Sequence, residues 1–373
     1  MSKHSEYKKV LTFFTASALF SSFSNAILPV HFLDSGVTLL GLAISHLLPW
    51  IFHPLLLFIF RKFSAKKAMI FAIAISMVQI LLIIHITNIW QFYLSSALFV
   101  VYVHFFFTPY NTIHFRNTEH ENNGFSSGIM FTIWSVIAFF TPILAGLVAE
   151  YNIAYLWFIS ILLFCVTLWK IQPLQDTYIS YKLSDSWQEL KSLRTIIILQ
   201  GFAETTFRSL IPIYTLHFID TALGFGGFMS FIGLVGGIGN IIFARFTDKI
   251  QSRSIFLYPM SIILGICTIL YPFASNDFRI WFFFAGMISL VSPIFNTLCL
   301  ALMTDRKLQL MIAVPGRELA LSLGRIMGGI CVVLSFMYEP TPRYIFYVLG
   351  CATFMIPVVL FTKSQLLKSQ SYL

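Results

Sequence analysis

The sequence predicts an all-α membrane protein with twelve transmembrane helices arranged as two six-helix halves. Three observations lead to this fold class: the composition, the number of long apolar stretches, and a repeat of the first half in the second. Of the 373 residues, 58% are apolar and 10% are charged, and the mean hydropathy is +0.83. Soluble domains carry about 25% charged residues. The composition therefore excludes a soluble enzyme, a disordered chain and a secreted disulfide scaffold.

Twelve apolar stretches are long enough to cross a membrane, because a bilayer core of about 30 Å needs roughly 20 apolar residues of helix. The expected spans are 10–33, 37–60, 68–89, 91–115, 126–149, 153–170, 195–219, 223–246, 254–274, 279–303, 310–337 and 343–362. Proline interrupts several of them, which membrane helices tolerate when neighbouring groups satisfy the freed backbone.

The basic residues divide unequally between the two sides of these spans. If the N-terminus is cytoplasmic, nineteen of the 24 lysines and arginines fall on the cytoplasmic side, and only Arg279 and Arg343 fall on the other. The positive-inside rule then predicts a multi-pass cell-membrane protein with both termini in the cytoplasm. The loops contain no N-x-[ST] sequon, which favours a bacterial inner membrane. The net charge of +9 is explained by these loops, so the expected surroundings are lipid and no nucleic-acid partner is expected.

The second half of the chain repeats features of the first. The sequence His31-Phe-Leu-Asp-Ser35 after the first span matches His217-Phe-Ile-Asp-Thr221 after the seventh, 186 residues later. The sequence Pro109-Tyr-Asn-Thr112 in the fourth span resembles Pro293-Ile-Phe-Asn-Thr297 in the tenth, with a one-residue slip. The predicted units are an N-terminal bundle (1–171), a cytoplasmic linker (172–194) with a short interfacial helix at 184–190, and a C-terminal bundle (195–373).

Two parallel six-helix halves joined by a linker resemble the major facilitator superfamily of transporters over essentially the whole chain. The family signature G-x-x-x-D-R-x-G follows the second span. Here Arg61 stands at the position of its aspartate, and both glycines are absent. The second copy of the loop keeps the acid, as Asp248. The resemblance implies a gate between the halves formed by these loops, with candidate residues Arg61, Lys62, Asp248, Lys249 and Arg253.

Five ionisable residues lie inside predicted spans of the C-terminal half, where an unpaired charge is costly and indicates a functional site. Glu204 and Arg208 share a helix face at i and i+4, and Glu318 and Arg325 are two turns apart on another. Pairing within each helix leaves Arg317 unpaired, and pairing between helices is equally compatible with the sequence. The three arginines favour an anionic or zwitterionic solute, and either glutamate could carry a proton. A purely structural ion-pair network is the alternative.

Uncharged polar residues complete the candidate substrate and proton site. They lie on spans that line the central cavity in the resembling family, or beside it, and Asn25 is expected opposite Arg208. These candidates are Asn25, His46, Tyr102, His104, Asn111 and Asn296. The histidines lie on separate helices without metal-ligand spacing, and no Cys-x-x-Cys pair occurs. No metal and no cofactor are expected.

These features predict a monomeric secondary active transporter that moves a small anionic or zwitterionic solute by alternating access, with proton coupling. No G-x-x-x-x-G-K-[ST] sequence occurs, so ATP-driven transport is not expected. One alternative is a polytopic membrane enzyme such as a lipid or isoprenoid transferase, although no D-D-x-x-D run is present. Another is a sensor that kept the fold and lost transport. The altered signature of the first loop supports this alternative. We do not expect the protein to be an enzyme.

Overall fold

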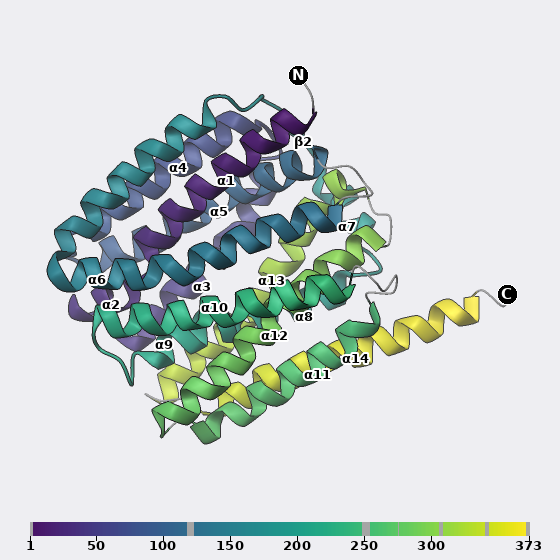
Figure 1. The fold of residues 1–373 in the computed structure, drawn as a ribbon. Helices are drawn as coiled ribbons and strands as arrows, with labels where there is room; N and C mark the ends of the chain where they lie inside the picture. Colours follow the sequence, from purple (N-terminus) through teal and green to yellow (C-terminus); the bar gives the residue numbers. More distant parts are fainter. Residues whose placement is uncertain are drawn as a thin grey trace.

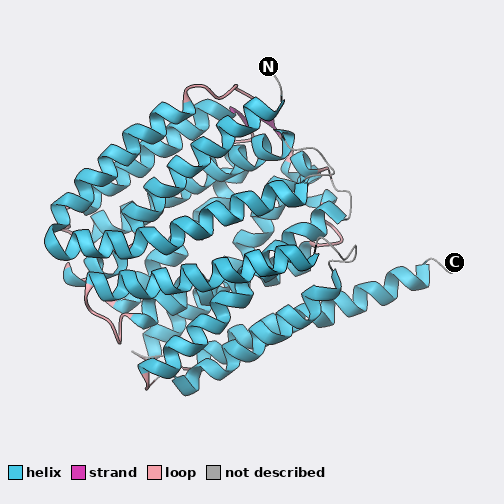
Figure 2. Cartoon of the chain, viewed as in Figure 1, coloured by secondary structure: helices cyan, strands magenta, loops and turns pink. Residues whose placement is uncertain are grey.

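The chain is almost entirely helical in the computed structural model, which describes residues 3–117, 123–247, 254–274, 276–305, 309–339 and 343–370 (Figure 2). The first half contains α1 (Lys3–Asn25), α2 (Leu28–Asp34), α3 (Leu39–Ile59), β1 (Lys62–Ser64), α4 (Ala65–Ile83), α5 (Ile89–Asn117) and α6 (Asn123–Ile171). The connecting segment contains β2 (Tyr178–Ser180) and α7 (Leu183–Glu189), so a short helix is present where the sequence predicts one.

The second half begins with a span built of three pieces: α8 (Arg194–Thr205), the π-helical turn η2 (Thr206–Leu210) and α9 (Ile211–Thr215). The remaining elements are α10 (Ala222–Thr247), α11 (Ser254–Leu270), the 3₁₀ turn η3 (Tyr271–Ala274), α12 (Phe278–Asp305), α13 (Leu310–Tyr338) and α14 (Tyr344–Gln370).

Eleven segments of the described chain are long and apolar enough to cross a membrane. One of them, Thr132–Ile171, is 40 residues long, which at 1.5 Å per residue is about twice the thickness of a bilayer core. Asn152 breaks this helix with a non-helical backbone (φ −166°, ψ 119°), and the chain turns back there, so α6 supplies two crossings (Figure 1). Counting both arms gives twelve, and the predicted fold class is confirmed.

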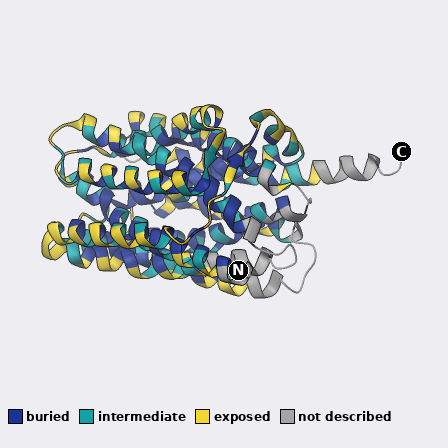
Figure 3. Ribbon diagram, turned by 90° about the horizontal axis from the view of Figure 1, so that it is seen from above, coloured by how far each residue is buried: buried dark blue, intermediate teal, exposed yellow. Residues whose placement is uncertain are grey.

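The two halves meet mainly where α6 contacts α10 and where α3 contacts α13. Glycine permits the first contact, because a Cβ at Gly226 or Gly233 of α10 would overlap the carbonyl of Pro142 or Ala138 in α6. Small residues allow helix backbones to approach in this way in membranes. Buried side chains gather between the helices, and exposed side chains lie on the outer surface (Figure 3). Many of these exposed side chains are large and apolar, as expected of a surface that faces lipid.

The start of α1, the strand β2, the helix α7 and the end of α14 lie at the same end of the molecule (Figure 1). Whether this end faces the cytoplasm remains a prediction, and Ser184 of α7 is exposed and can test it. A membrane-impermeant maleimide should leave Ser184→Cys unlabelled in intact cells and label it after permeabilisation, in a background without the native cysteines. Tyr151→Cys, at the bend of α6, is the matched control and should label from outside. Strong labelling of Ser184→Cys in intact cells would contradict the topology.

Candidate functional site

A cluster of charged side chains lies where α8 and η2 pack against α13, near the middle of their spans. Glycines set the close approach of these helices: a Cβ at Gly201 of α8 would overlap the Leu321 carbonyl, and one at Gly324 of α13 would overlap the Ile198 carbonyl. The two backbones are therefore nearly in contact. This proximity allows a side chain on α8 to reach one on α13 without stretching.

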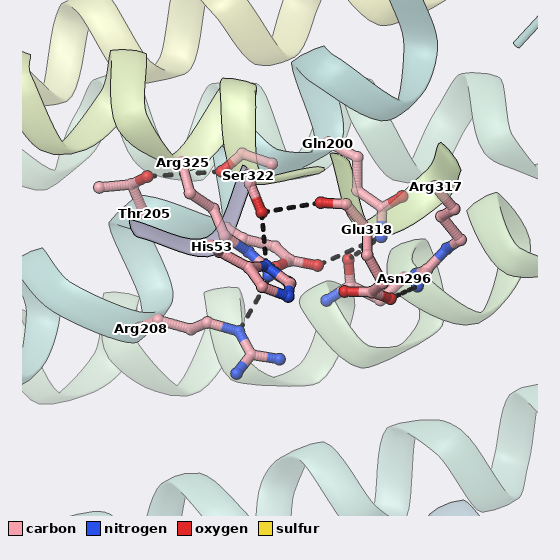
Figure 4. Close-up of polar contacts among 11 residues, drawn as sticks. His53, Gln200, Thr205, Arg208, Asn296, Arg317, Glu318, Ser322 and Arg325 are labelled. Atoms are coloured by element: carbon pink, nitrogen blue, oxygen red, sulfur yellow. Dashed lines mark hydrogen bonds and ion pairs between the residues drawn. The ribbon is translucent and has the colours of Figure 1, made fainter. Parts of the chain in front are cut away.

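Glu204 is the centre of the cluster, and its side chain is only 5% exposed. Arg325 donates two hydrogen bonds to Oε2 of Glu204, from Nε at 3.0 Å and from Nη2 at 2.6 Å (Figure 4). Nε of Arg208 lies 3.4 Å from the same oxygen. Gln200, one turn before Glu204, donates to Oε1 at 3.2 Å and also bonds Oδ1 of Asn296 at 3.0 Å. Both carboxylate oxygens thus accept hydrogen bonds. A buried charge is costly unless it is paired and hydrogen-bonded in this way.

Arg208 occupies the π-helical turn and is the most accessible charge in the cluster, with 57% of its side chain exposed. Pro212 has no N–H to give the carbonyl four residues earlier, and the Ile211 N–H instead bonds the Thr206 carbonyl in the π pattern. Among the described residues, Glu204 is the only ion-pair partner found for Arg208. Its guanidinium projects away from the other labelled side chains (Figure 4), leaving the Nη edge available to a ligand.

Arg325 connects the two halves of the molecule. Its guanidinium carbon lies 4.2 Å from the centroid of the Trp50 ring on α3, a cation–π contact. Between α3 and the charged cluster lies a small cavity, lined by His46, Trp50, Glu204, Thr205, Arg208, Ser209, Arg325 and Gly329. A second cavity lies on the other side of Glu204 and is lined in part by Ser292 and Asn296.

Each cavity offers about 10 Å³ to a water-sized molecule. That is room for about one water, whereas ligand sites usually measure about 300–1,000 Å³. The structure therefore shows these helices packed closely around the cluster.

The sequence profile of the Major Facilitator Superfamily matches residues 10–329. The chain belongs to this family. Three solved structures illustrate the shared fold. A proton-dependent oligopeptide transporter matches with a TM-score of 0.73 and 13% identity, over 99% of this chain and 100% of the other. The Escherichia coli fucose:proton symporter matches at 0.63 and 13%, over 96% and 98%. A human organic anion transporter matches at 0.69 and 12%, over 95% and 99%. The search of curated protein sequences gave no match.

The sequence left pairing within each helix and pairing between helices open, and the cluster of this superfamily member contains both kinds. Arg208 does contact Glu204, as the i,i+4 spacing predicts. Glu318 does not pair with Arg325, and Arg317 is not left over: Nη1 of Arg317 lies 3.0 Å from Oε1 of Glu318. Seven residues separate Glu318 and Arg325, about 10.5 Å along the helix. Arg325 instead finds Glu204 on the adjacent helix, which lies closer.

A buried histidine on α3 forms a second contact across the halves. Nδ1 of His53 and Oγ of Ser322 on α13 are 2.7 Å apart. The Ser322 hydroxyl donates its proton to the Glu318 carbonyl, so Nδ1 of His53 acts as the donor to Ser322. The ring of His104 on α5 lies 5.7 Å from that of His53. His104 therefore packs beside this contact, outside the lining of the two cavities.

The remaining candidates lie away from the charged cluster, apart from His46 and Asn296. Asn25 donates to the Ser21 carbonyl of its own helix at 2.7 Å. Tyr102 is buried and stacks on Phe106, and Asn111 is half-buried on α5. The gate candidates Arg61 and Lys62 are exposed, and Asp248, Lys249 and Arg253 lie outside the described residues. Within the described chain, no group of His, Cys, Asp or Glu is arranged to hold a metal ion.

Sequence reasoning did not place four residues that the structure brings to the site: Gln200, Trp50, His53 and Ser322. Gln200 could have been found, because it precedes Glu204 by four residues and must share its helix face. Trp50 and Ser322 carry no charge, and their roles depend on which helices pack together. His53 lies seven residues after His46 and so shares its helix face, but its contact with Ser322 depends on α3 packing against α13.

Proposed function

We propose that the chain is a secondary active transporter that moves a small anionic or zwitterionic solute across a membrane by alternating access, coupled to protons. Its membership of the major facilitator superfamily supports transport. The similar structures are 12–13% identical and show the fold alone, so the solute class and the coupling rest on the charged cluster.

The free guanidinium edge of Arg208 is the observation that carries the anionic substrate. The cluster holds three arginines and two glutamates, a net charge of one positive. Glu204 is engaged by Arg325 and Gln200 as well as by Arg208, and Glu318 by Arg317. Arg208 is the exposed arginine of the described cluster with unused hydrogen-bonding capacity, whereas the unpartnered Nε of Arg317 is buried. A guanidinium edge matches a carboxylate or phosphate in a bidentate manner.

The position of Arg208 suits alternating access. It lines a cavity to which His46 and Trp50 contribute from the first half and Arg325 from the second. A solute bound there would contact both halves, and its binding energy could favour the conformations in which they close around it. This is the midplane position expected of a substrate site between transporter repeats.

We expect proton coupling because the solute anion and Glu204 would compete for Arg208. A solute anion on the Nη edge would draw the guanidinium away from Glu204, whose 3.4 Å contact with Nε is the longest ion pair in the cluster. A carboxylate that loses a neighbouring cation takes up a proton more readily. Glu204 would then bind a proton together with the solute and release both on the other side. Glu318 has one cation partner and is the second candidate proton carrier.

Flux in proteoliposomes without nucleotide tests the proposal, with a panel of organic anions, sugars and cations. We expect organic anions to be transported in the wild type. Arg208→Lys should weaken transport about tenfold through loss of the bidentate geometry, and Arg208→Gln should weaken it further. Both variants should stay folded because Arg208 is more than half exposed. Arg279→Gln changes an exposed arginine outside both the charged cluster and the gate loops, and is the control.

Transport at the wild-type rate in Arg208→Gln would remove this residue from the substrate site. Formation of a chemical product by the purified protein would favour the membrane enzyme instead. Ligand binding without flux would favour the sensor.

A further inference from the structure

The segment that follows α6 is tied to the loop that follows α3. Strand β2 pairs with β1 in antiparallel register, with Lys62 opposite Ser180 and Ser64 opposite Tyr178. Two further backbone hydrogen bonds extend the pairing, from the Ala65 N–H to the Thr177 carbonyl at 2.8 Å and from the Tyr181 N–H to the Arg61 carbonyl at 3.1 Å. The hydroxyl of Tyr181 donates to the carbonyls of Leu57 and Phe60, where α3 ends.

Asp176 supplies a carboxylate to this loop, which has Arg61 where the superfamily signature has an acid. Its Oδ2 accepts from the Ser64 hydroxyl at 2.6 Å, and its Oδ1 accepts from the Lys66 N–H at 3.1 Å. Ser64 in turn caps α4 by accepting from the Lys67 N–H. The carboxylate thus lies at the N-terminus of α4, where the helix dipole favours a negative charge.

The same contacts keep Asp176 charged. Partial burial acts to raise its pKa, but the hydrogen bonds from Ser64, Lys66 and Thr177, together with the charge of Lys67, hold the pKa below its ordinary value of 3.8. The stabilisation is therefore present at neutral pH and is lost only as the pH falls through that lowered pKa.

The other end of the segment contacts the second half. Helix α7 packs on the start of α13, where a Cβ at Gly316 would overlap the Ser186 carbonyl. Oε1 of Glu189 accepts from the Gln309 N–H, immediately before α13, at 2.9 Å. Leu190 is fully buried behind α7 and fixes its position.

We propose that residues 172–190 form a strap that holds the two halves together at this end of the molecule, and that α7 must leave α13 when this end opens. Through Asp176 the strap gives the loop after α3 a carboxylate that the loop's own sequence lacks. Its first end is held by a strand pair and by several side-chain hydrogen bonds. Among the described residues, its second end has one hydrogen bond, which Glu189 accepts from Gln309, and a glycine contact. The second end therefore releases first. The release step rests on alternating access, whereas the strap itself does not.

Hydrogen–deuterium exchange on the full-length protein tests the strap without needing a substrate. In Gly316→Ala the added methyl meets backbone, which cannot move aside, so amide exchange in 183–189 should rise about tenfold. Exchange in 62–64 and 178–180 should stay unchanged. Gly227→Ala is the matched control, because a Cβ there meets nothing within 4 Å. Asp176→Ala should give the reverse pattern, with faster exchange in 62–67 and 178–181.

Unchanged exchange of α7 in Gly316→Ala would overturn the strap. If that variant does not fold, Glu189→Ala provides the same readout through loss of the Gln309 hydrogen bond. Joining Glu189→Cys to Gln309→Cys with a short bismaleimide tests the release step, and transport should fall at least about tenfold. The two single-cysteine variants, treated identically, are the controls. Undiminished flux in the cross-linked protein would show that α7 does not have to leave α13 during transport. If the wild type transports nothing, the proposed function fails, and the exchange data still decide whether the strap exists.

Discussion

Glu204→Gln is expected to be the most damaging single charge removal in this protein. It would leave Arg325 buried beside Trp50 without its counter-ion, and Arg325 is only 9% exposed. Breaking a buried ion pair by removing one partner costs about 3–5 kcal/mol. We expect a lower midpoint of thermal unfolding and a loss of transport. Unfolding in detergent and flux in proteoliposomes measure the two effects, and Asp185→Asn, at an exposed position on α7, is the control.

The double variant Glu204→Gln with Arg325→Gln separates a structural role from a functional one. Removing both charges should restore part of the thermal stability, because no unpaired charge remains between α8 and α13. Transport should stay lost if Glu204 carries the proton. The companion double variant Glu204→Gln with Arg208→Gln should recover less stability, since Arg208 is largely exposed and Arg325 would still lack its partner. Wild-type flux in either double variant would show that the removed pair is scaffolding.

Gly324→Ala is expected to have the second largest effect, although it adds only a methyl group. The new Cβ would overlap the Ile198 carbonyl and lie 2.8 Å from the Phe202 nitrogen, both in the backbone of α8. The helices must then separate, and overpacking of this kind costs about 1–3 kcal/mol. Separation would also lengthen the bonds between Arg325 and Glu204, so transport should fall as well. Thermal unfolding and flux are measured as before.

Gly227→Ala is the matched control for this variant, because the same methyl group enters open space on α10. If Gly324→Ala were as stable and as active as Gly227→Ala, close packing of α8 on α13 would not be what positions the charged cluster.

The sequence was most informative about the site where the chemistry is local. The pairing of Glu204 with Arg208 follows from a separation of four residues on one helix, and the structure contains it. The shortest bond to Glu204 comes instead from Arg325, 121 residues away. That bond depends on Gly201 and Gly324 bringing α8 and α13 together, and the glycines in a sequence do not reveal which helix they face. For the same reason the sequence left open whether Arg325 pairs with Glu318 on its own helix or with a residue of another helix, and the structure pairs it with Glu204.

The altered loop after α3 is a second place where the sequence alone could not predict the contacts. Its sequence indicates that an acid is missing at Arg61, and nothing near it in the chain supplies one. Asp176, more than a hundred residues later, reaches Ser64 and Lys66 because β1 and β2 pair. Strands of only three residues carry too little signal to be predicted.

The sequence by itself determined the number and position of the membrane-crossing helices, because each span must be apolar over a length that the bilayer sets. It also determined that charges lie inside the second half, because such residues stand out in an apolar run. Only the tertiary structure decided which charges meet, that Trp50 and His53 of the first half contact α13 of the second, and what holds the linker. Those contacts depend on helix–helix packing, where a few glycines and one π-helical turn set distances of a few ångströms, and such distances arise between segments far apart in the chain.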